Sequence, residues 1–149
     1  MEQFNVLVGA VVTHKDSFLL LQRSSNEHFL PSVWGIPAGK VEYEEDILNA
    51  VLRELREESG IAGSITAVTG SSWFSSQNSE GRIRNIQINF AIETHSAEVQ
   101  LDSSSQAYLW VSWVELESPP VPIDDFTRQA LLQARAHLKS IRAISPSAK

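Results

Sequence analysis

The sequence predicts an α+β fold in which one mixed β-sheet packs between helices. Three observations indicate this fold: two β-rich apolar runs open the chain, a helical repeat follows them, and further β-rich runs precede a second helical repeat. Strands and helices in this order do not alternate regularly, so α+β is favoured over a regularly wound α/β arrangement. A chain of 149 residues with 42% hydrophobic content fits a single domain spanning residues 1–149.

The chain is predicted to begin with a β-hairpin. Residues 4–13 form an apolar run rich in β-formers, residues 14–17 carry turn-forming side chains, and residues 18–22 form a second apolar run. Residues 24–31 show neither period and are predicted to be a loop.

Residues 46–59 are predicted to form an amphipathic helix. Asp46 has the character of an N-cap, and Gly60 stands where a helix-ending residue is expected. The apolar side chains at helical spacing are predicted to form its buried stripe: Ile47, Leu48, Val51, Leu52 and Leu55.

The second half is predicted to hold three strands and a helix. Residues 65–74 and 84–94 form β-rich runs joined by a polar segment, residues 75–81, and residues 107–114 form the third run. Residues 125–141 show an amphipathic helical pattern, and residues 143–149 are predicted to be a frayed tail.

Composition excludes several classes of function. A net charge of −6 makes long nucleic acids and anionic membranes poor partners, because both need a basic face. The chain has no cysteine, no apolar run of membrane-spanning length and no signal-peptide pattern at its start. The cytoplasm is therefore the expected location.

A group of three glutamates indicates a metal site. Glu54, Glu57 and Glu58 lie three and four positions apart, so they share a helix face of roughly 100°. Like charges this close repel unless a cation joins them, and Mg²⁺, with Mn²⁺ as an alternative, is the usual ion for oxygen ligands. A solvated acidic face is the simpler alternative. The helix dipole disfavours acids at the carboxyl end by about 0.3–1 kcal/mol each, which favours metal binding.

The spacing of these residues also resembles a known family. The pattern resembles the full signature of the Nudix hydrolases: Gly39, five residues, Glu45, seven residues, Arg53-Glu54-Leu55, one residue, Glu57-Glu58, one residue, Gly60-Ile61. Residues 34–39 look like the family's lead-in, and Tyr108-Leu109-Trp110-Val111 looks like its late strand. The resemblance covers residues 6–138 and implies an α/β/α sandwich in which the signature forms a loop–helix–loop.

The resemblance implies a metal-dependent hydrolase that cleaves a diphosphate linkage. It places the metal on carboxylates of the helix and a backbone carbonyl of the preceding loop: Glu54, Glu57, Glu58 and Ala38. Arg53 resembles the residue that orients these carboxylates, the alternative being an ordinary surface pair with Glu57. Glu45 is expected to support the loop.

Three positions depart from the family pattern. Ala38 and Glu44 stand where glycine is common, which bears on loop shape. Ser104 stands where relatives often carry an acid that serves as extra metal ligand or general base. Asp102, Glu98, Glu93, or Glu58 with its neighbours, remain as candidates for the base: the sequence does not choose among them.

Substrate choice rests on weaker signals. Arg23 is a candidate phosphate contact, with simple solvation as the alternative. Trp34 and Tyr108, like Trp73 and Phe74, are candidates for stacking on a base, although aromatics at strand spacing are more often core. The proline and tyrosine that mark the ADP-ribose and dinucleoside polyphosphate hydrolases are missing downstream. A nucleoside triphosphate or a compact nucleoside diphosphate derivative is what remains as the small-molecule partner.

Two other readings of the chain remain open at this point. The missing late acid is compatible with an inactive Nudix-fold module that senses nucleotides or binds proteins, although such a module has no reason to retain three repelling carboxylates. The helix could also be an acidic scaffold that binds no ion. A homodimer is expected only by analogy, because dimers are common among relatives.

Overall fold

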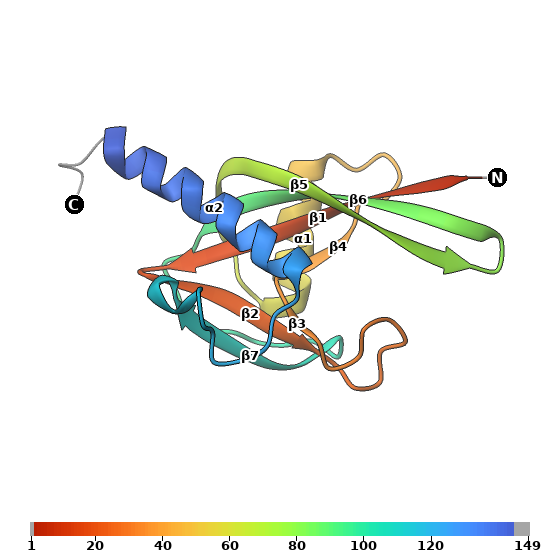
Figure 1. Cartoon of the computed structure of the whole chain (residues 1–149), viewed down its shortest axis with the longest axis horizontal. Helices are drawn as coiled ribbons and strands as arrows, with labels where there is room; N and C mark the ends of the chain where they lie inside the picture. The colour runs from red at the N-terminus through yellow and green to blue at the C-terminus, as the bar shows by residue number, and fades with distance from the viewer. Residues whose placement is uncertain (1, 145–149) are drawn as a thin grey trace.

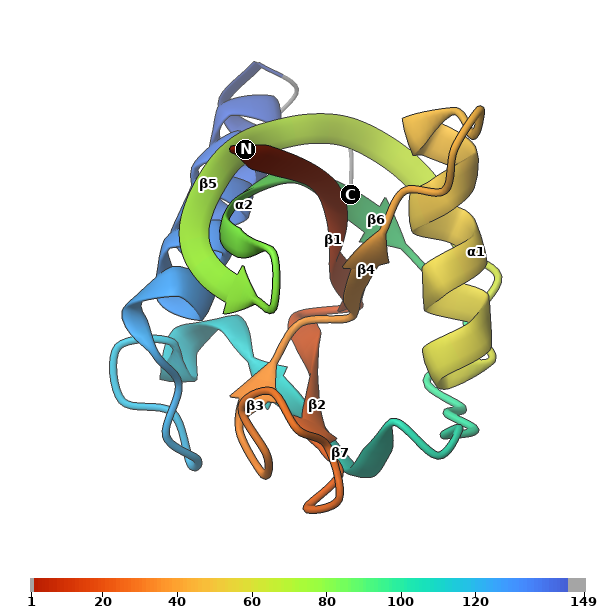
Figure 2. The ribbon, with the colours of Figure 1, turned by 90° about the vertical axis from the view of Figure 1, so that its right-hand side faces the viewer.

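The computed structural model describes residues 2–144, with side chains described up to residue 140. The elements in chain order are β1 (Gln3–His14), β2 (Ser17–Arg23), β3 (Trp34–Gly35), β4 (Ala38–Lys40), α1 (Ile47–Ser59), β5 (Ser64–Asn78), β6 (Gly81–Glu93), β7 (Ser105–Ser112), the 3₁₀ turn η1 (Trp113–Glu115) and α2 (Asp125–Ile144). The two helices lie on opposite sides of the strands (Figures 1 and 2). The predicted α+β sandwich with a mixed sheet is confirmed.

The sheet divides alongside β1, and this division creates the site. β1 runs parallel to β6 from Gln3 to Thr13, and every other strand pairing is antiparallel. β2 pairs with β1 only next to their connecting turn and then continues with β3 and β7. The freed edge of β1 pairs instead with β4, which opposes residues 7–9 with residues 38–40. β4 therefore brings Ala38 and Gly39 to the centre of the molecule.

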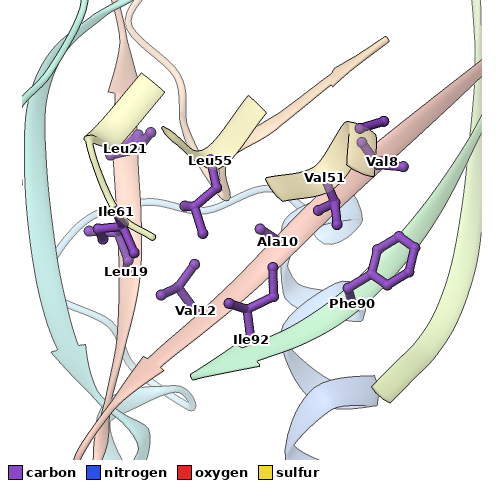
Figure 3. Close-up of a cluster of buried hydrophobic side chains, with 11 residues drawn as sticks. Val8, Ala10, Val12, Leu19, Leu21, Val51, Leu55, Ile61, Phe90 and Ile92 are labelled. Carbon is purple, nitrogen blue, oxygen red and sulfur yellow. The ribbon is translucent and has the colours of Figure 1, made fainter. Parts of the chain in front are cut away.

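Apolar side chains fill both faces of the sheet. On the α1 side, Val8, Ala10 and Val12 of β1 pack with residues of β2, β6 and α1, as Figure 3 shows for the labelled cluster. Val11, which points to the other face, packs with Phe18, Leu20 and the α2 residues Ala130, Leu131 and Ala134. Because the side chains of a strand alternate between faces, β1 contributes to both cores and holds the layers together.

Helix α1 has the predicted ends. The Asp46 carboxylate accepts hydrogen bonds from the backbone N–H groups of Leu48 and Asn49, and Gly60 ends the helix with φ of 75°. Val51 and Leu55 are fully buried, as expected for the stripe, and Ile47 and Leu52 pack against the same core. Leu48 was expected in this stripe, but its side chain is 44% exposed. Ala50 is buried instead, because the buried face of the helix is turned from Leu48 toward Ala50 relative to the prediction.

Several predicted boundaries were wrong in the second half. Residues 75–78 and 81, predicted as part of a polar connection, belong to β5 and β6, which form one long ribbon closed by a turn at residues 79 and 80. β6 also begins before the predicted strand start at residue 84. The ribbon projects from the body of the sheet in Figure 1, so polar side chains on it remain compatible with strand structure. β7 ends at Ser112 and is followed by η1, and the short strands β3 and β4 were not predicted.

The carboxyl-terminal helix is longer than predicted. α2 continues to Ile144, so residues 143 and 144, which were assigned to the tail, are helical; residues 145–149 lie outside the described residues. Within residues 2–144, no helix has both the length and the apolar character needed to cross a bilayer.

Glu44 occupies a backbone conformation that favours glycine. The N–H of Glu45 donates to the carbonyl of Glu42 at 3.0 Å, which closes a four-residue turn, and Glu44 at its third position has φ of 65°. A turn with positive φ at this position is of type II, in which glycine is preferred because a Cβ atom clashes there. The departure from glycine noted in the sequence is therefore a local strain.

We expect Glu44→Gly to raise the free energy of unfolding by about 0.5–1 kcal/mol, because relief of the left-handed conformation outweighs the added chain entropy. Urea unfolding followed by circular dichroism measures the change. The matched control is Tyr43→Gly at the preceding position, which is 96% exposed and has no positive φ. The control is expected to lower stability, and equal effects of the two substitutions would contradict the assignment of strain to Glu44.

Candidate active site

Arg53 lies at the centre of a network of acidic side chains. Its guanidinium makes a two-point pair with Glu45, from Nε to Oε2 at 2.7 Å and from Nη2 to Oε1 at 2.9 Å. Nη1 donates to Glu54 at 3.0 Å and to Glu57 at 3.3 Å, and Nη2 donates to the backbone carbonyl of Lys40 at 3.1 Å. The network joins the loop before α1 to the acidic face of the helix. Arg53 therefore contacts two of the three helix glutamates, and its orienting role stays a prediction.

The charges in this network shift the pKa values of its members. Hydrogen bonding from Arg53, and then from the backbone of Glu42, lowers the pKa of Glu45 to about 2. The pKa of Arg53 is raised, chiefly by its hydrogen bonds to Glu45. Glu45 and Arg53 thus form a permanent ion pair at neutral pH, and this pair keeps the loop and the helix in one arrangement.

Glu54 is fitted closely between α1 and β4. A Cβ atom at Gly39 would collide with the Glu54 carboxylate, so only glycine lets β4 approach the helix at this point. Burial raises the pKa of Glu54, although the hydrogen bond from Arg53 opposes the shift. The glycine of the signature therefore makes room for one of the predicted metal ligands.

Glu58 is a half-buried carboxylate with a single hydrogen bond in the described structure. Its Oε1 accepts from the backbone N–H of Ala38 at 3.1 Å. Burial raises the pKa of Glu58 to about 8, and the charge of Glu54 adds to the shift more than that of Asp102 does. The hydrogen bond from Ala38 and the more distant charge of Arg23 oppose the shift without cancelling it. Among the side chains that the structure describes, none forms an ion pair with this carboxylate as Arg53 does with Glu45.

The three glutamates are gathered but do not form a finished metal site. Among residues 2–144, no three acidic or histidine side chains converge in a geometry that holds an ion. Arg53 draws Glu54 and Glu57 toward itself, whereas Glu58 faces Ala38. The Glu57 side chain is 56% exposed, so leaving Arg53 would cost it little.

A cavity of about 200 Å³ opens beside Glu58. Its lining combines side chains from the divided sheet, the loop before β7 and the start of α2: Leu21, Arg23, Leu30, Val33, Trp34, Gly35, Ile36, Ala38, Glu58, Gln87, Ser104, Ser105, Asp124, Phe126 and Thr127. Acidic, basic, amide and flat apolar groups thus share one space. This mixture is typical of a site for a polar ligand with a ring.

The structure brings two of the three predicted substrate contacts to this cavity. Arg23 and Trp34 line it. Arg23 is held in place by a hydrogen bond from its Nε to the carbonyl of Phe29 at 2.8 Å and lies 3.6 Å from Glu27. Tyr108 is not among the lining residues; it lies on β7 opposite Leu21 and is 44% exposed. Its predicted stacking role has no geometric support here.

One of the candidate bases lies near Glu58. Asp102 Oδ1 accepts from the backbone N–H of Ser104 at 2.9 Å and from its hydroxyl at 2.5 Å, and Ser104 lines the cavity. The charge of Asp102 contributes to the raised pKa of Glu58. Glu98 lies by a different hollow, next to His95, and Glu93 pairs with Thr13 and Ser64 at the far end of the sheet.

The loop that carries Asp102 is anchored on both sides. The Trp110 indole N–H donates to the carbonyl of Ala97 at 2.9 Å, and the N–H of Gln100 donates to the carbonyl of Ser59 at 2.8 Å. These bonds tie the loop to β7 and to the carboxyl end of α1. The same end of α1 carries Glu58, so the loop is held next to it.

Four further lining residues were missed by the sequence reasoning: Gln87, Asp124, Phe126 and Thr127. Amides and isoleucines alternate in residues 85–89. This pattern predicts a strand with one polar and one apolar face, so the three amides could have been recognised as sharing a face. Asp124 also had a signal as a helix N-cap, and its Oδ1 accepts from the N–H of Thr127 at 2.8 Å. Neither pattern indicates by itself that these faces meet at Glu58.

Comparison with known proteins decides the family. The model of the NUDIX domain matches residues 3–136. The chain belongs to the Nudix hydrolase family. Members of this family are typically pyrophosphohydrolases and generally use a divalent metal ion. The resemblance in the signature is thereby confirmed over most of the chain.

Two relatives match this Nudix chain over most of its length. The crystal structure of a MutT protein from Methanosarcina mazei Go1 superposes with a TM-score of 0.78 at 26% identity, covering 93% of this chain and 97% of that chain. The nucleoside triphosphatase NudI of Escherichia coli K12 is 29% identical over 114 residues, which is 70% of this chain and 79% of NudI.

Two vertebrate proteins match this Nudix chain over a short stretch. The m7GpppN-mRNA hydrolase NUDT17 of Xenopus laevis is 49% identical over 43 residues, 29% of this chain and 14% of that protein. The 8-oxo-dGDP phosphatase NUDT18 of Danio rerio is 43% identical over 56 residues, 37% of this chain and 17% of that protein. The match thus spans less than a fifth of the length of either relative.

We expect the metal-free protein to lose stability as the pH rises from about 4.5 to about 8. The pKa of Glu58 is near 4.5 when unfolded and about 8 when folded, so unfolding releases a proton across this range and ionisation favours the unfolded state. Thermal unfolding in EDTA at a series of pH values measures the loss, which should reach about 2 kcal/mol or more.

Glu58→Gln is the matched control for this pH dependence, since the amide can still accept from Ala38 and has no proton to release. The substitution should raise the stability of the metal-free protein increasingly toward pH 8 and leave it nearly unchanged near pH 4. A wild-type curve parallel to that of Glu58→Gln would show that Glu58 ionises normally.

Proposed function

We propose that this chain, as one domain over residues 1–149, is a Mg²⁺-dependent pyrophosphohydrolase. Its substrate would be a nucleoside triphosphate or another small molecule built on a nucleoside diphosphate, with Mn²⁺ as an alternative ion. The observation that carries the proposal is the position of Glu58. It is a half-buried carboxylate without an ion-pair partner among the described residues, at the wall of a cavity that also contains a cation, Arg23, and flat apolar side chains. Family membership and the relationship to NudI support it.

The residues present suit a hard divalent cation. Burial raises the pKa of both Glu54 and Glu58, and neighbouring carboxylates raise each further: Glu57 and Glu45 act on Glu54, and Glu54 acts on Glu58. A cation bound beside them would relieve these effects. Glu54 and Glu58, joined by Glu57 and the carbonyl of Ala38, would supply only oxygen ligands, which suits Mg²⁺. When bound, the ion would neutralise charge on the diphosphate and lower the pKa of a bound water.

The chain's own groups would bind and orient the substrate. Arg53 would keep Glu54 and the loop before α1 in place, and Arg23 would pair with a phosphate oxygen at the cavity. In the reaction, water forms a new O–P bond as the P–O–P bond breaks, and the leaving phosphate group takes the electron pair. The proton released by the water would pass to the hydroxyl of Ser104 as that hydroxyl gives its own proton to Asp102.

A phosphate-release screen over nucleotides with Mg²⁺ and Mn²⁺ tests the activity. We expect hydrolysis of at least one nucleotide, and more than about a hundredfold lower kcat/KM in Glu57→Gln and in Glu58→Gln. Glu42→Gln is the matched control, because Glu42 lies only 3.8 Å from Arg53 but has a side chain that is 69% exposed. Full activity in both helix variants would refute the metal assignment. Mg²⁺-dependent nucleotide binding without turnover would favour the inactive sensing module.

The role of Asp102 has a separate test. Loss of the proton acceptor in Asp102→Asn should lower kcat about a hundredfold or more, with little change in KM. Glu98→Gln, a change of acid to amide in the same loop but at a different hollow, should have no effect. Equal kcat values for the two variants would show that Asp102 is not the proton acceptor and would favour Glu58 in that role.

A further inference from the structure

An apolar patch crosses three strands on the α1 side of the sheet. Val6 of β1 lies opposite Ile86 of β6, which in turn lies opposite Trp73 of β5, so the three side chains form one row on one face. The next row toward the start of β1 begins with Phe4. We call this surface the strand patch, and its members are Phe4, Val6, Trp73, Arg84 and Ile86.

Neither helix covers the strand patch. Phe4 is 62% exposed, Trp73 is 59% exposed and Val6 is 41% exposed. Helix α1 packs farther along β1, where the side chains on the same face are buried in the core, and α2 packs on the opposite face. In Figure 1 the start of β1 and the β5–β6 ribbon extend beyond both helices. The strand patch is therefore a sheet face without a partner in the described chain.

The strand patch has the size of an interface centre. A fully exposed aromatic side chain offers about 150–250 Å², so Phe4 and Trp73 together leave roughly 200–300 Å² of apolar surface in water. Scattered apolar side chains are normal on a surface, whereas a contiguous group of this size indicates a binding partner. A stable interface buries about 800 Å² on each partner, with an apolar centre and a polar rim.

One side of the strand patch carries a positive charge. The Arg84 guanidinium lies over the Trp73 ring, 4.4 Å from its centroid. Arg84 is exposed, and it belongs to none of the ion pairs found within residues 2–144. Its charge is thus available to a carboxylate from outside the chain.

The other side of the strand patch carries negative charges. β6 lies along one edge of β1, and the other edge receives the N–H of Val41, which donates to the carbonyl of Val6 at 2.9 Å. The loop that continues from Val41 presents two exposed acids, Glu42 and Glu44. Glu42 lies 3.8 Å from Arg53, whereas Glu44 has no ion-pair partner among the described residues. The apolar side chains of β1 therefore separate an unpaired cation from an unpaired acid.

We propose that the strand patch is a contact between two copies of this chain, related by a two-fold axis that passes near Phe4 and Val6. Half a turn about this axis exchanges the two sides of the patch, so Arg84 of each copy faces the partner's Glu44. The apolar side chains of the two copies meet at the centre. In a two-fold interface one surface must complement itself, and a patch with opposite charges on its two sides does so.

A second copy fits the strand patch better than a nucleic acid does. A nucleic acid requires a basic stripe, but this patch is flanked by acids and the chain has a net charge of −6. A second copy also accounts for Glu44, which retains a side chain at a position where positive φ favours glycine. A carboxylate that pairs with the partner would offset that local strain.

Association does not depend on the proposed hydrolysis, so it is tested on the full chain without a substrate. Sedimentation velocity over about 1–100 μM should show a species of twice the chain mass of 16.5 kDa. Phe4→Asp should raise the Kd of this dimer about tenfold or more, because it places a charge at the apolar centre. Val114→Asp is the matched control, since Val114 is 87% exposed but lies on η1, and it should leave the Kd unchanged.

A charge exchange tests the two-fold arrangement. Arg84→Glu and Glu44→Arg should each raise the Kd about 5- to 20-fold, and the double variant should return it to within about threefold of the original value. Arg84→Glu combined with Glu115→Arg has the same net charge as the double variant. Glu115 lies on η1, outside the strand patch, so this combination should not restore the dimer.

The outcomes divide as follows between support and refutation. A monomer at every concentration, or a dimer that Phe4→Asp does not weaken, would overturn the proposal. If Phe4→Asp does not fold by circular dichroism, restoration by the charge exchange decides in favour of the proposal and its absence decides against it. A monomer whose fluorescence is quenched by single-stranded RNA, but not in Trp73→Ser, would assign the strand patch to a nucleic acid and overturn the dimer.

Discussion

The two-point pair between Arg53 and Glu45 is the interaction on which the rest of the site depends. It joins a loop residue to a helix residue eight positions later, and its charge-assisted geometry is stronger than a neutral hydrogen bond. From this position Arg53 also reaches Glu54, Glu57 and the carbonyl of Lys40. The loop carries Ala38 and Gly39 into β4, so one guanidinium sets the distance between the helix carboxylates and the backbone that faces them. Lysine could not replace it, because a single ammonium group cannot make a planar two-point pair.

The distribution of charge around Arg53 also explains why Glu58 differs from its neighbours. Four acids share one cation: Glu42, Glu45, Glu54 and Glu57. Glu58 forms no ion pair with Arg53 and accepts instead from the N–H of Ala38. A carboxylate in that position either takes up a proton or binds a cation from solution. The chain has a net charge of −6, which repels a polyphosphate. Because a bound metal ion reverses the local field, cation binding at Glu58 would also allow a polyphosphate to approach.

The sequence predicted the parts of the site that depend on local spacing. The helix, its caps at Asp46 and Gly60, and the shared face of Glu54, Glu57 and Glu58 all follow from neighbours within a few positions along the chain. The strain at Glu44 could be suspected for the same reason. The cavity could not be predicted, because Gln87, Ser104 and Asp124 come from three separate segments that only the division of the sheet brings together. Leu48 was misplaced because periodicity gives the direction of an apolar stripe only to within the width of one residue. Packing against β1 then decides which residues at the edge of the stripe are buried.

The two faces of this sheet differ in their buried polar side chains, and this difference indicates on which face a ligand binds. The α1 face is packed with valine, leucine, isoleucine and phenylalanine, which is sufficient to hold the fold. The opposite face holds an apolar cluster with Ala130, Leu131 and Ala134 of α2, and β6 adds to this face the buried amides Asn85, Gln87 and Asn89. Asn89 Nδ2 is buried without a partner among the described residues, and such an atom lowers stability. Gln87, which Asn89 holds by a hydrogen bond, lines the cavity together with Glu58, so the polar part of this face and the acidic face of α1 open onto one space.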